Sequence, residues 1–191
     1  MDDPRGDPST RPVGGMRTVV LAPAPAELEA LLARRRESGA DAYDDVWEGV
    51  VHVAPMAPPW RGRVQSSLMA TIDALAVRAG LEPCGPFNLG DPSDFRIPDA
   101  GVFDEPTPDA FVARAVLVVE VVSPDDETFG KFAFYADHGV REVLTADPQE
   151  RQVRVWRLDG AAAGEAHEVE HCEVLDASAA ALTAAVRWPS D

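Results

Sequence analysis

Residues 115–122 read Ala-Val-Leu-Val-Val-Glu-Val-Val, and this run constrains the fold more than any other segment of the chain. Apart from Glu120 it is apolar and rich in β-branched residues, which predicts a strand that is buried on both faces. A carboxylate in such a strand is costly unless it is paired or bound to a metal ion. Glu120 is therefore either a buried glutamate satisfied by an arginine or by backbone donors, or part of a metal site.

Asp99 supplies a second carboxylate, directly after Pro98 and at the start of another short predicted strand. If the two strands are neighbours, the carboxylates of Asp99 and Glu120 can meet on one face of the sheet. Two carboxylates, a backbone carbonyl and water molecules suit Mg²⁺, which keeps much of its hydration shell in proteins. Considered alone, an aspartate after proline is more typical of a turn.

Lys131 and Tyr135 are spaced i, i+4 on one face of the next predicted helix. A lysine beside a metal-bound water can position that water or stabilise charge that develops on a phosphate. A helix that started directly after the strand would put Lys131 about 12 Å along its axis, too far to reach Glu120. We therefore expect residues 123–127 to be mostly loop, with the helix beginning near Thr128. Considered alone, Lys131 would be an ordinary solvated lysine.

Several short motifs, in the order in which they occur, resemble the Uma-type restriction endonuclease family within the PD-(D/E)XK nuclease superfamily. They are Trp47-Glu48-Gly49-Val50-Val51, Ala57-Pro58-Pro59, Pro98-Asp99, Glu120-Val121-Val122-Ser123-Pro124, Lys131 with Tyr135, Gly139-Val140-Arg141-Glu142-Val143 and Asp147-Pro148. The likeness covers about residues 27–188. An ordered series of this kind is much more specific than any single acid.

The resemblance implies a restriction-endonuclease-like core in which Asp99 and Glu120 bind Mg²⁺, or Mn²⁺ in its place, with the Val121 carbonyl as a further ligand. Lys131 takes over from the superfamily lysine that normally lies two residues after the second acid. Tyr135 and Asp45 would support the site from outside the metal ligands. DNA is the implied substrate, and a homodimer is implied because superfamily nucleases often pair to cut both strands.

Three departures from the family pattern leave the predicted metal ligands in place. Asp44-Asp45 stands where the family has Tyr-Glu, Arg61 replaces a histidine common after the Pro-Pro turn, and Glu142-Val143-Leu144 replaces Glu-Tyr-Trp. Two hypotheses follow. The first is a Mg²⁺-dependent endonuclease that hydrolyses phosphodiester bonds in DNA, and the second is a catalytically inactive nuclease-fold module with a binding or regulatory role.

The net charge of −16 favours the second hypothesis, because affinity for DNA comes largely from Lys and Arg side chains that neutralise phosphates. The basic clusters are residues 34–36 and the pair Arg61 and Arg63. We interpret the first as a solvated helix end that the helix dipole favours. The pair suits a solvated surface and a phosphate-binding patch equally well.

Two other candidate metal sites are disfavoured. Residues 167–171 spell His-Glu-Val-Glu-His, but a zinc protease needs this motif on a helix together with a third ligand. The segment alternates like a strand, in which the two histidines would be about 13 Å apart. Cys84 and Cys172 are too few for a cysteine zinc site, and we expect free thiols.

The remaining patterns predict an α/β (α+β) fold with a mixed β-sheet flanked by helices. Helices are expected at 26–36, 60–79 and the second half of 123–138, and strands at 18–22, 46–53 with a turn or bulge at 48–49, 82–87, 94–97, 101–103, 115–122, 141–146, 152–158, 166–175 and 182–188. The composition of residues 1–15 predicts a disordered leader, and we expect residues 16–191 to form a single domain. The sequence shows neither a membrane-spanning run nor a signal peptide, so we expect a cytoplasmic protein.

Overall fold

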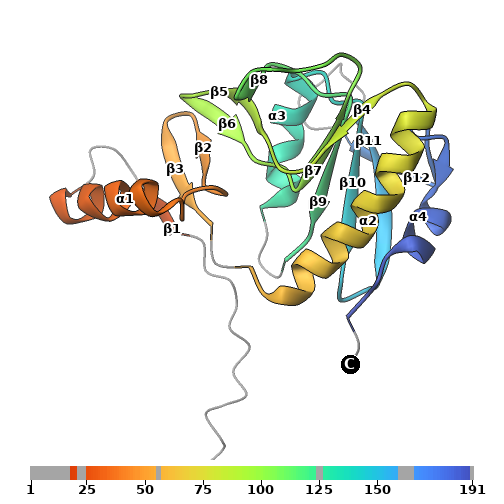
Figure 1. Ribbon diagram of the computed structural model, residues 1–191, viewed down its shortest axis with the longest axis horizontal. Helices are drawn as coiled ribbons and strands as arrows, with labels where there is room; N and C mark the ends of the chain where they lie inside the picture. The colour runs from red at the N-terminus through yellow and green to blue at the C-terminus, as the bar shows by residue number, and fades with distance from the viewer. Residues whose placement is uncertain (1–17, 21–24, 55–56, 124–126, 159–165, 190–191) are drawn as a thin grey trace, which may run out of the picture.

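The computed structural model describes residues 18–20, 25–54, 57–123, 127–158 and 166–189. Within these residues the strands form two six-stranded sheets and one two-stranded ribbon, with helices packed around them (Figure 1). The predicted leader at residues 1–15 lies outside the described residues. The arrangement confirms the α/β (α+β) class, although the strands are divided between two larger sheets.

The elements take their labels from Figure 1. The strands are β1 (Thr18–Val20), β2 (Asp45–Trp47), β3 (Val50–Val53), β4 (Glu82–Cys84), β5 (Asn88–Asp91), β6 (Asp94–Arg96), β7 (Ala100–Phe103), β8 (Phe111–Val112), β9 (Leu117–Val121), β10 (Glu142–Asp147), β11 (Gln152–Leu158), β12 (Ala166–Val169), β13 (His171–Cys172) and β14 (Ala177–Ser178). The helices are α1 (Ala26–Ser38), α2 (Pro59–Arg78), the 3₁₀ helix η2 (Thr128–Lys131), α3 (Phe132–Asp137) and α4 (Ala179–Ala185). None of these described helices is both long and apolar enough to cross a membrane.

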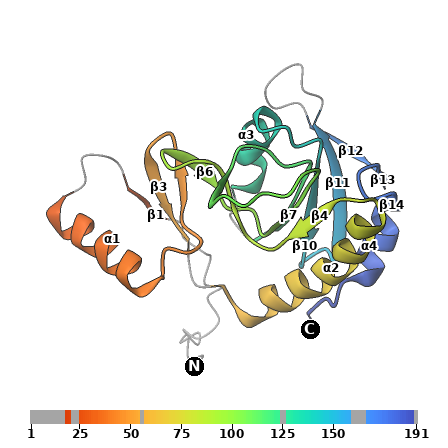
Figure 2. The ribbon, with the colours of Figure 1, turned by 45° about the horizontal axis from the view of Figure 1, so that its top comes forward.

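One sheet, here called the central sheet, has the strand order β12-β11-β10-β9-β7-β4. Strands β9 and β10 run parallel, while the other neighbouring pairs are antiparallel. Helices α2 and α4 cover one face, and α3 packs on the other (Figure 2). Because both faces are covered, every residue of β9 is buried, as the apolar run predicts.

The two-residue period of β9 divides its side chains between two hydrophobic cores. Leu117, Val119 and Val121 join the core on the α2 and α4 side, and Val118 joins the core on the α3 side. Glu120 has the same parity as Val118 and therefore faces α3. The strand thus directs a single carboxylate towards η2 and α3, which carry Lys131 and Tyr135 respectively.

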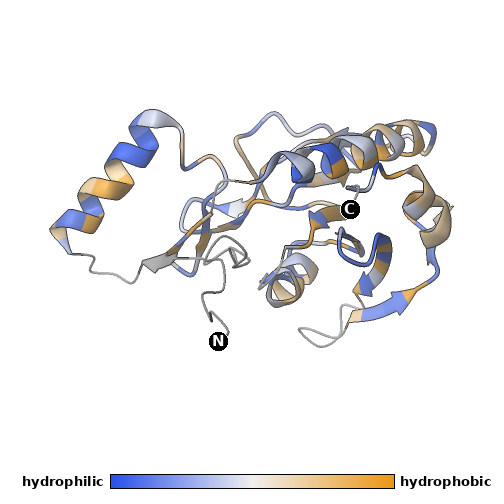
Figure 3. Ribbon diagram, turned by 90° about the horizontal axis from the view of Figure 1, so that it is seen from below, coloured by the Kyte–Doolittle hydropathy of each residue, from blue (hydrophilic) through white to orange (hydrophobic). Residues whose placement is uncertain are grey.

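The other large sheet has the order β1-β3-β2-β6-β5-β8. Its β2–β3 hairpin turns at Glu48 and Gly49, whose φ angles of 50° and 83° identify a tight turn, so the bulge is excluded. Helix α1 extends away from the rest of the molecule, with hydrophobic and hydrophilic segments along its length (Figure 3), and none of its residues is buried.

The prediction that residues 182–188 form a strand is wrong. Leu182 lies in α4, and its side chain is fully buried in the core on the α2 side. The helix begins where Ser178 Oγ accepts a hydrogen bond from the Ala181 backbone N–H at 3.1 Å, and its alanine-rich sequence favours helix. The predicted strand 166–175 is also shorter than expected, because the chain bends at Glu170 and β13 then pairs with β14.

Candidate active site

Asp99 and Glu120 are brought together by the pairing of β7 with β9. The register pairs Ala100 with Val119, so continuing it by one residue places Asp99 across from Glu120. Oδ2 of Asp99 accepts a hydrogen bond from the Val121 backbone N–H at 2.7 Å, which holds the two segments together. Asp99 is 8% exposed and Glu120 is 3% exposed. Two largely desolvated carboxylates therefore meet at one end of β9.

Glu120 is held by two donors from the helical segment that follows β9. Lys131 Nζ lies 3.0 Å from Oε1 of Glu120, and the Tyr135 hydroxyl donates a hydrogen bond to the same oxygen. Burial raises the pKa of Glu120 to about 7, and the negative charge of Asp99 adds to this, while Lys131 opposes it. Burial and the charge of Glu120 raise the pKa of Tyr135, so its hydroxyl stays protonated and donates.

Lys131 reaches Glu120 because its helix starts late, as expected from the sequence. The helical segment begins with η2 at Thr128, and residues 124–126 lie outside the described residues. The ammonium of Lys131, which is 2% exposed, lies between Glu120 and Asp45, with Nζ 3.3 Å from Asp45 Oδ2. Lys131 Nζ therefore contacts two buried carboxylates that come from different sheets.

Asp45 comes from β2, in the sheet that is separate from the central one. It is 1% exposed, and its Oδ1 accepts the Ile97 backbone N–H at 2.7 Å while its Oδ2 contacts Lys131. This acid therefore connects the hairpin sheet to the candidate site. The family comparison suggested Asp45 as a shorter substitute for a glutamate, and the structure places it in contact with Lys131.

Two residues of α2 also contact Asp99. Arg61 Nη2 donates to Asp99 Oδ2 at 2.7 Å, and Arg61 Nη1 donates to Ser123 Oγ. One turn later, Gln65 Nε2 donates to the Asp99 carbonyl at 2.6 Å. Arg61 stood out in the sequence as a basic residue in place of the family histidine. Nothing singled out Gln65, although its i, i+4 spacing from Arg61 was a usable signal.

The donor set suits a hard divalent cation that keeps several waters. Within the described residues, no group of three or more His, Cys, Asp or Glu side chains is arranged to hold a metal ion. The hydrogen bonds to the Asp99 carboxylate fall on Oδ2 and those to Glu120 fall on Oε1. Each carboxylate therefore keeps its other oxygen as a potential metal ligand. Two such oxygens, a backbone carbonyl and water match the preference of Mg²⁺.

The other sequence candidates lie elsewhere. His167 is on β12 and His171 on β13, with a bend between them and no helix, and His171 Nε2 lies 3.1 Å from Asp176 Oδ1. Cys84 and Cys172 are free thiols, as expected. This segment thus lacks the helix that the zinc protease motif requires.

The mixed central sheet with helices on both faces belongs to the restriction-endonuclease-like fold class. The structure is similar to a crystal structure described as that of a putative nuclease belonging to DUF820 from Anabaena variabilis, with a TM-score of 0.58 and 17% sequence identity, covering 74% of this chain and 89% of that one. Residues 26–186 match the family described as "Uma2: Putative restriction endonuclease", and the chain belongs to this family. No curated protein matches the sequence.

Proposed function

We propose that this protein is a Mg²⁺-dependent endonuclease that hydrolyses phosphodiester bonds in DNA. The observation that carries the proposal is the placement of Asp99 across from Glu120, with Lys131 Nζ 3.0 Å from Glu120. Asp99, Glu120 and the Val121 carbonyl would hold the ion, and Mn²⁺ would substitute for it. Membership of a restriction endonuclease family supports a nucleic acid substrate.

Hydrolysis adds water across one P–O bond and yields a phosphate monoester and an alcohol. A bound divalent ion would lower the pKa of a coordinated water and offset the charge of the phosphate. Lys131 would orient the attacking water and balance the negative charge that develops at phosphorus. Tyr135 would keep Glu120 in one orientation through its hydrogen bond, and Asp45 would do the same for Lys131.

A second function is favoured by one contact, the ion pair between Arg61 and Asp99. The guanidinium occupies Oδ2 of a predicted metal ligand, and the net charge of −16 opposes DNA binding. Both features suit a catalytically inactive module with a binding or regulatory role. The two functions differ in whether Asp99 can bind a divalent cation while Arg61 is paired with its Oδ2.

Plasmid cleavage separates these functions. We expect the wild-type protein to nick or linearise supercoiled plasmid in Mg²⁺ or Mn²⁺, with no cleavage in EDTA. Asp99→Asn should lose this activity, whereas Asp73→Asn, which changes an exposed aspartate on α2, should retain it. An absence of both cleavage and Mn²⁺ binding in the wild-type protein would favour the inactive module.

The affinity for metal is expected to rise with pH. Since burial raises the pKa of Glu120 to about 7, a proton competes with the cation below that pH. About ten times more of the carboxylate is ionised at pH 8 than at pH 6, so Mn²⁺ should bind about tenfold more tightly at pH 8. Titration calorimetry measures this change, and an affinity that is equal at the two pH values would contradict the assignment of Glu120 as a ligand.

A further inference from the structure

A pocket of about 240 Å³ opens beside the candidate site, where the parallel strands β9 and β10 end. Its lining includes Trp60, Pro148 and Pro189, which have ring side chains, and Ser123, Asp147 and Gln149, which are polar. In α/β sheets, ligands commonly bind beyond the carboxyl ends of parallel strands. The pocket thus offers flat apolar surfaces with hydrogen-bonding groups at such a position.

One guanidinium connects this pocket to the candidate metal ligands. Arg61 donates to Ser123 Oγ in the pocket wall and to Asp99 Oδ2 at 2.7 Å. Trp60 precedes Arg61 in the first turn of α2. A nucleotide whose phosphate lay at the acids would therefore have a neighbouring base within reach of the pocket.

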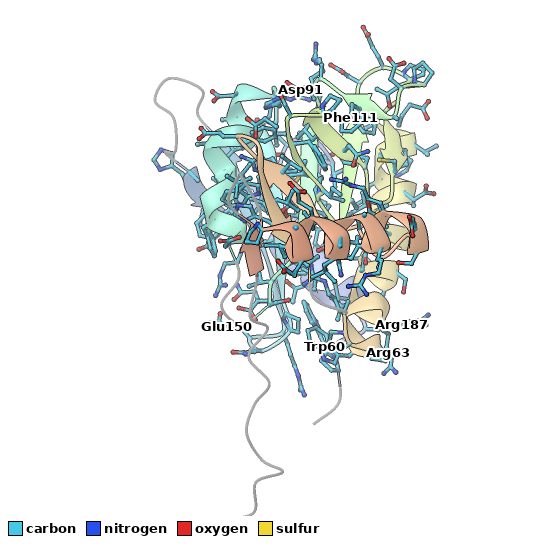
Figure 4. The ribbon with its side chains drawn as sticks, turned by 90° about the vertical axis from the view of Figure 1, so that its left-hand side faces the viewer. Trp60, Arg63, Asp91, Phe111, Glu150 and Arg187 are labelled. Carbon is cyan, nitrogen blue, oxygen red and sulfur yellow. The ribbon has the colours of Figure 1, made fainter. Side chains whose placement is uncertain are left out.

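Arginines gather around the same end of the molecule. Trp60, Arg63 and Arg187 lie close together in Figure 4, and the Arg187 backbone N–H donates to Ser67 Oγ on α2 at 2.9 Å. Arg63 and Arg187 are exposed, and Arg61 is partly exposed. In a chain with a net charge of −16, such a local group is the kind of patch that can attract phosphates.

We propose that this pocket binds one unpaired nucleobase of the cleaved strand, stacked on the indole of Trp60. The inference rests on the proposed nuclease function. Arg63 and Arg187 contact the flanking phosphates, and the side-chain amide of Gln149 presents polar groups to the edge of the base. Because a base inside a continuous duplex is stacked on both faces, the pocket selects single-stranded, bulged or frayed segments over continuous duplex.

Fluorescence anisotropy without divalent metal tests the pocket separately from catalysis. The probes are a short labelled single-stranded deoxyoligonucleotide, the same strand with abasic sites, its duplex and its ribose counterpart. Trp60→Ala should weaken binding of the intact single strand by about 5- to 160-fold, the usual range for loss of one aromatic–base stack. Trp60→Phe should restore most of the affinity, which would exclude a folding defect. Trp156→Ala removes a half-buried tryptophan on the α3 side and should leave binding unchanged.

The outcomes distinguish the pocket from the nuclease. Equal effects of Trp60→Ala on the intact and the abasic strand would overturn the proposal, even if plasmid cleavage is normal. Base-dependent binding that needs Trp60 in a wild-type protein that does not cleave would support the pocket and refute the nuclease function. Tighter binding of the ribose strand than of the deoxy strand would support the pocket and identify an RNA strand as the source of its base, whereas tighter binding of the duplex would overturn the proposal.

Discussion

Glu120→Gln is expected to reduce plasmid cleavage at least about 100-fold while the free energy of unfolding at pH 8 stays level or rises. Gln has nearly the shape of Glu, so the hydrogen bond from Tyr135 has an acceptor in the variant. It lacks the negative charge that a divalent cation requires. The change therefore removes the proposed metal ligand without opening a cavity.

The effect on stability follows from the raised pKa. Folded Glu120 keeps its proton up to about pH 7, whereas in the unfolded chain the carboxyl loses it near its ordinary pKa of 4.5. Between these values the folded state binds more protons, so the free energy of unfolding falls as pH rises. The accumulated loss at pH 8 is about 3 kcal/mol. Since Gln does not titrate, the free energy of unfolding of the Glu120→Gln variant should not show this decrease between pH 5 and pH 8.

Urea unfolding at pH 5 and pH 8, run beside the cleavage assay, measures both effects. Glu82→Gln is the matched control, because this side chain is exposed at the start of β4 and should change neither quantity. Cleavage that survives Glu120→Gln would remove Glu120 from the site. An unchanged pH dependence of unfolding would show that Glu120 is ionised at low pH in the folded protein.

Lys131→Met is expected to lower the free energy of unfolding by about 3–5 kcal/mol at pH 8 and by less at pH 5. Lys131 Nζ lies 3.0 Å from Glu120 and 3.3 Å from Asp45, so its removal leaves two buried carboxylates without their shared cation. At pH 5 Glu120 is protonated and the repulsion is smaller. Met keeps most of the volume of Lys, which limits the effect of packing.

A double-mutant cycle resolves this prediction. In the Lys131→Met background, Glu120→Gln removes one of the two carboxylates that contact Lys131 in the wild-type protein and should recover a large part of the lost stability. Arg63→Met, at an exposed position on α2, serves as the control for loss of a cation. If Lys131→Met stays within about 1 kcal/mol of wild type at pH 8, Lys131 is not the counter-ion of the two acids.

The buried strand and its carboxylate were predictable from local sequence, whereas contacts from distant elements were not. Because Glu120 is the one acid in an apolar run, its burial and its need for a partner could both be predicted. Lys131 could reach Glu120 only if the helix started late, which was also predictable. The contacts of Arg61 and Gln65 with Asp99 depend on how α2 packs on the central sheet, which no local pattern encodes. Residues 182–185 have apolar and small side chains that suit a strand or a helix, and they end α4, which packs beside α2.

The division of the strands between two sheets could not be predicted from local sequence either. The β2–β3 hairpin has the same alternation that it would have as part of the central sheet, so its pattern does not reveal which sheet it joins. From the sequence alone, Asp45 was therefore only a shorter acid at a position where the family has a glutamate. The structure shows it 1% exposed and paired with Lys131.

The position of Asp45 sets a limit on how far the chain could be trimmed from its amino end. A fragment that kept only the central sheet and its helices would retain Asp99, Glu120 and Lys131, yet it would lose Asp45, whose carboxylate lies 3.3 Å from the lysine. The smallest unit that preserves this charge balance therefore begins before β2. The hairpin, although remote from the acids in sequence, is as much a part of that unit as the strand that carries Glu120.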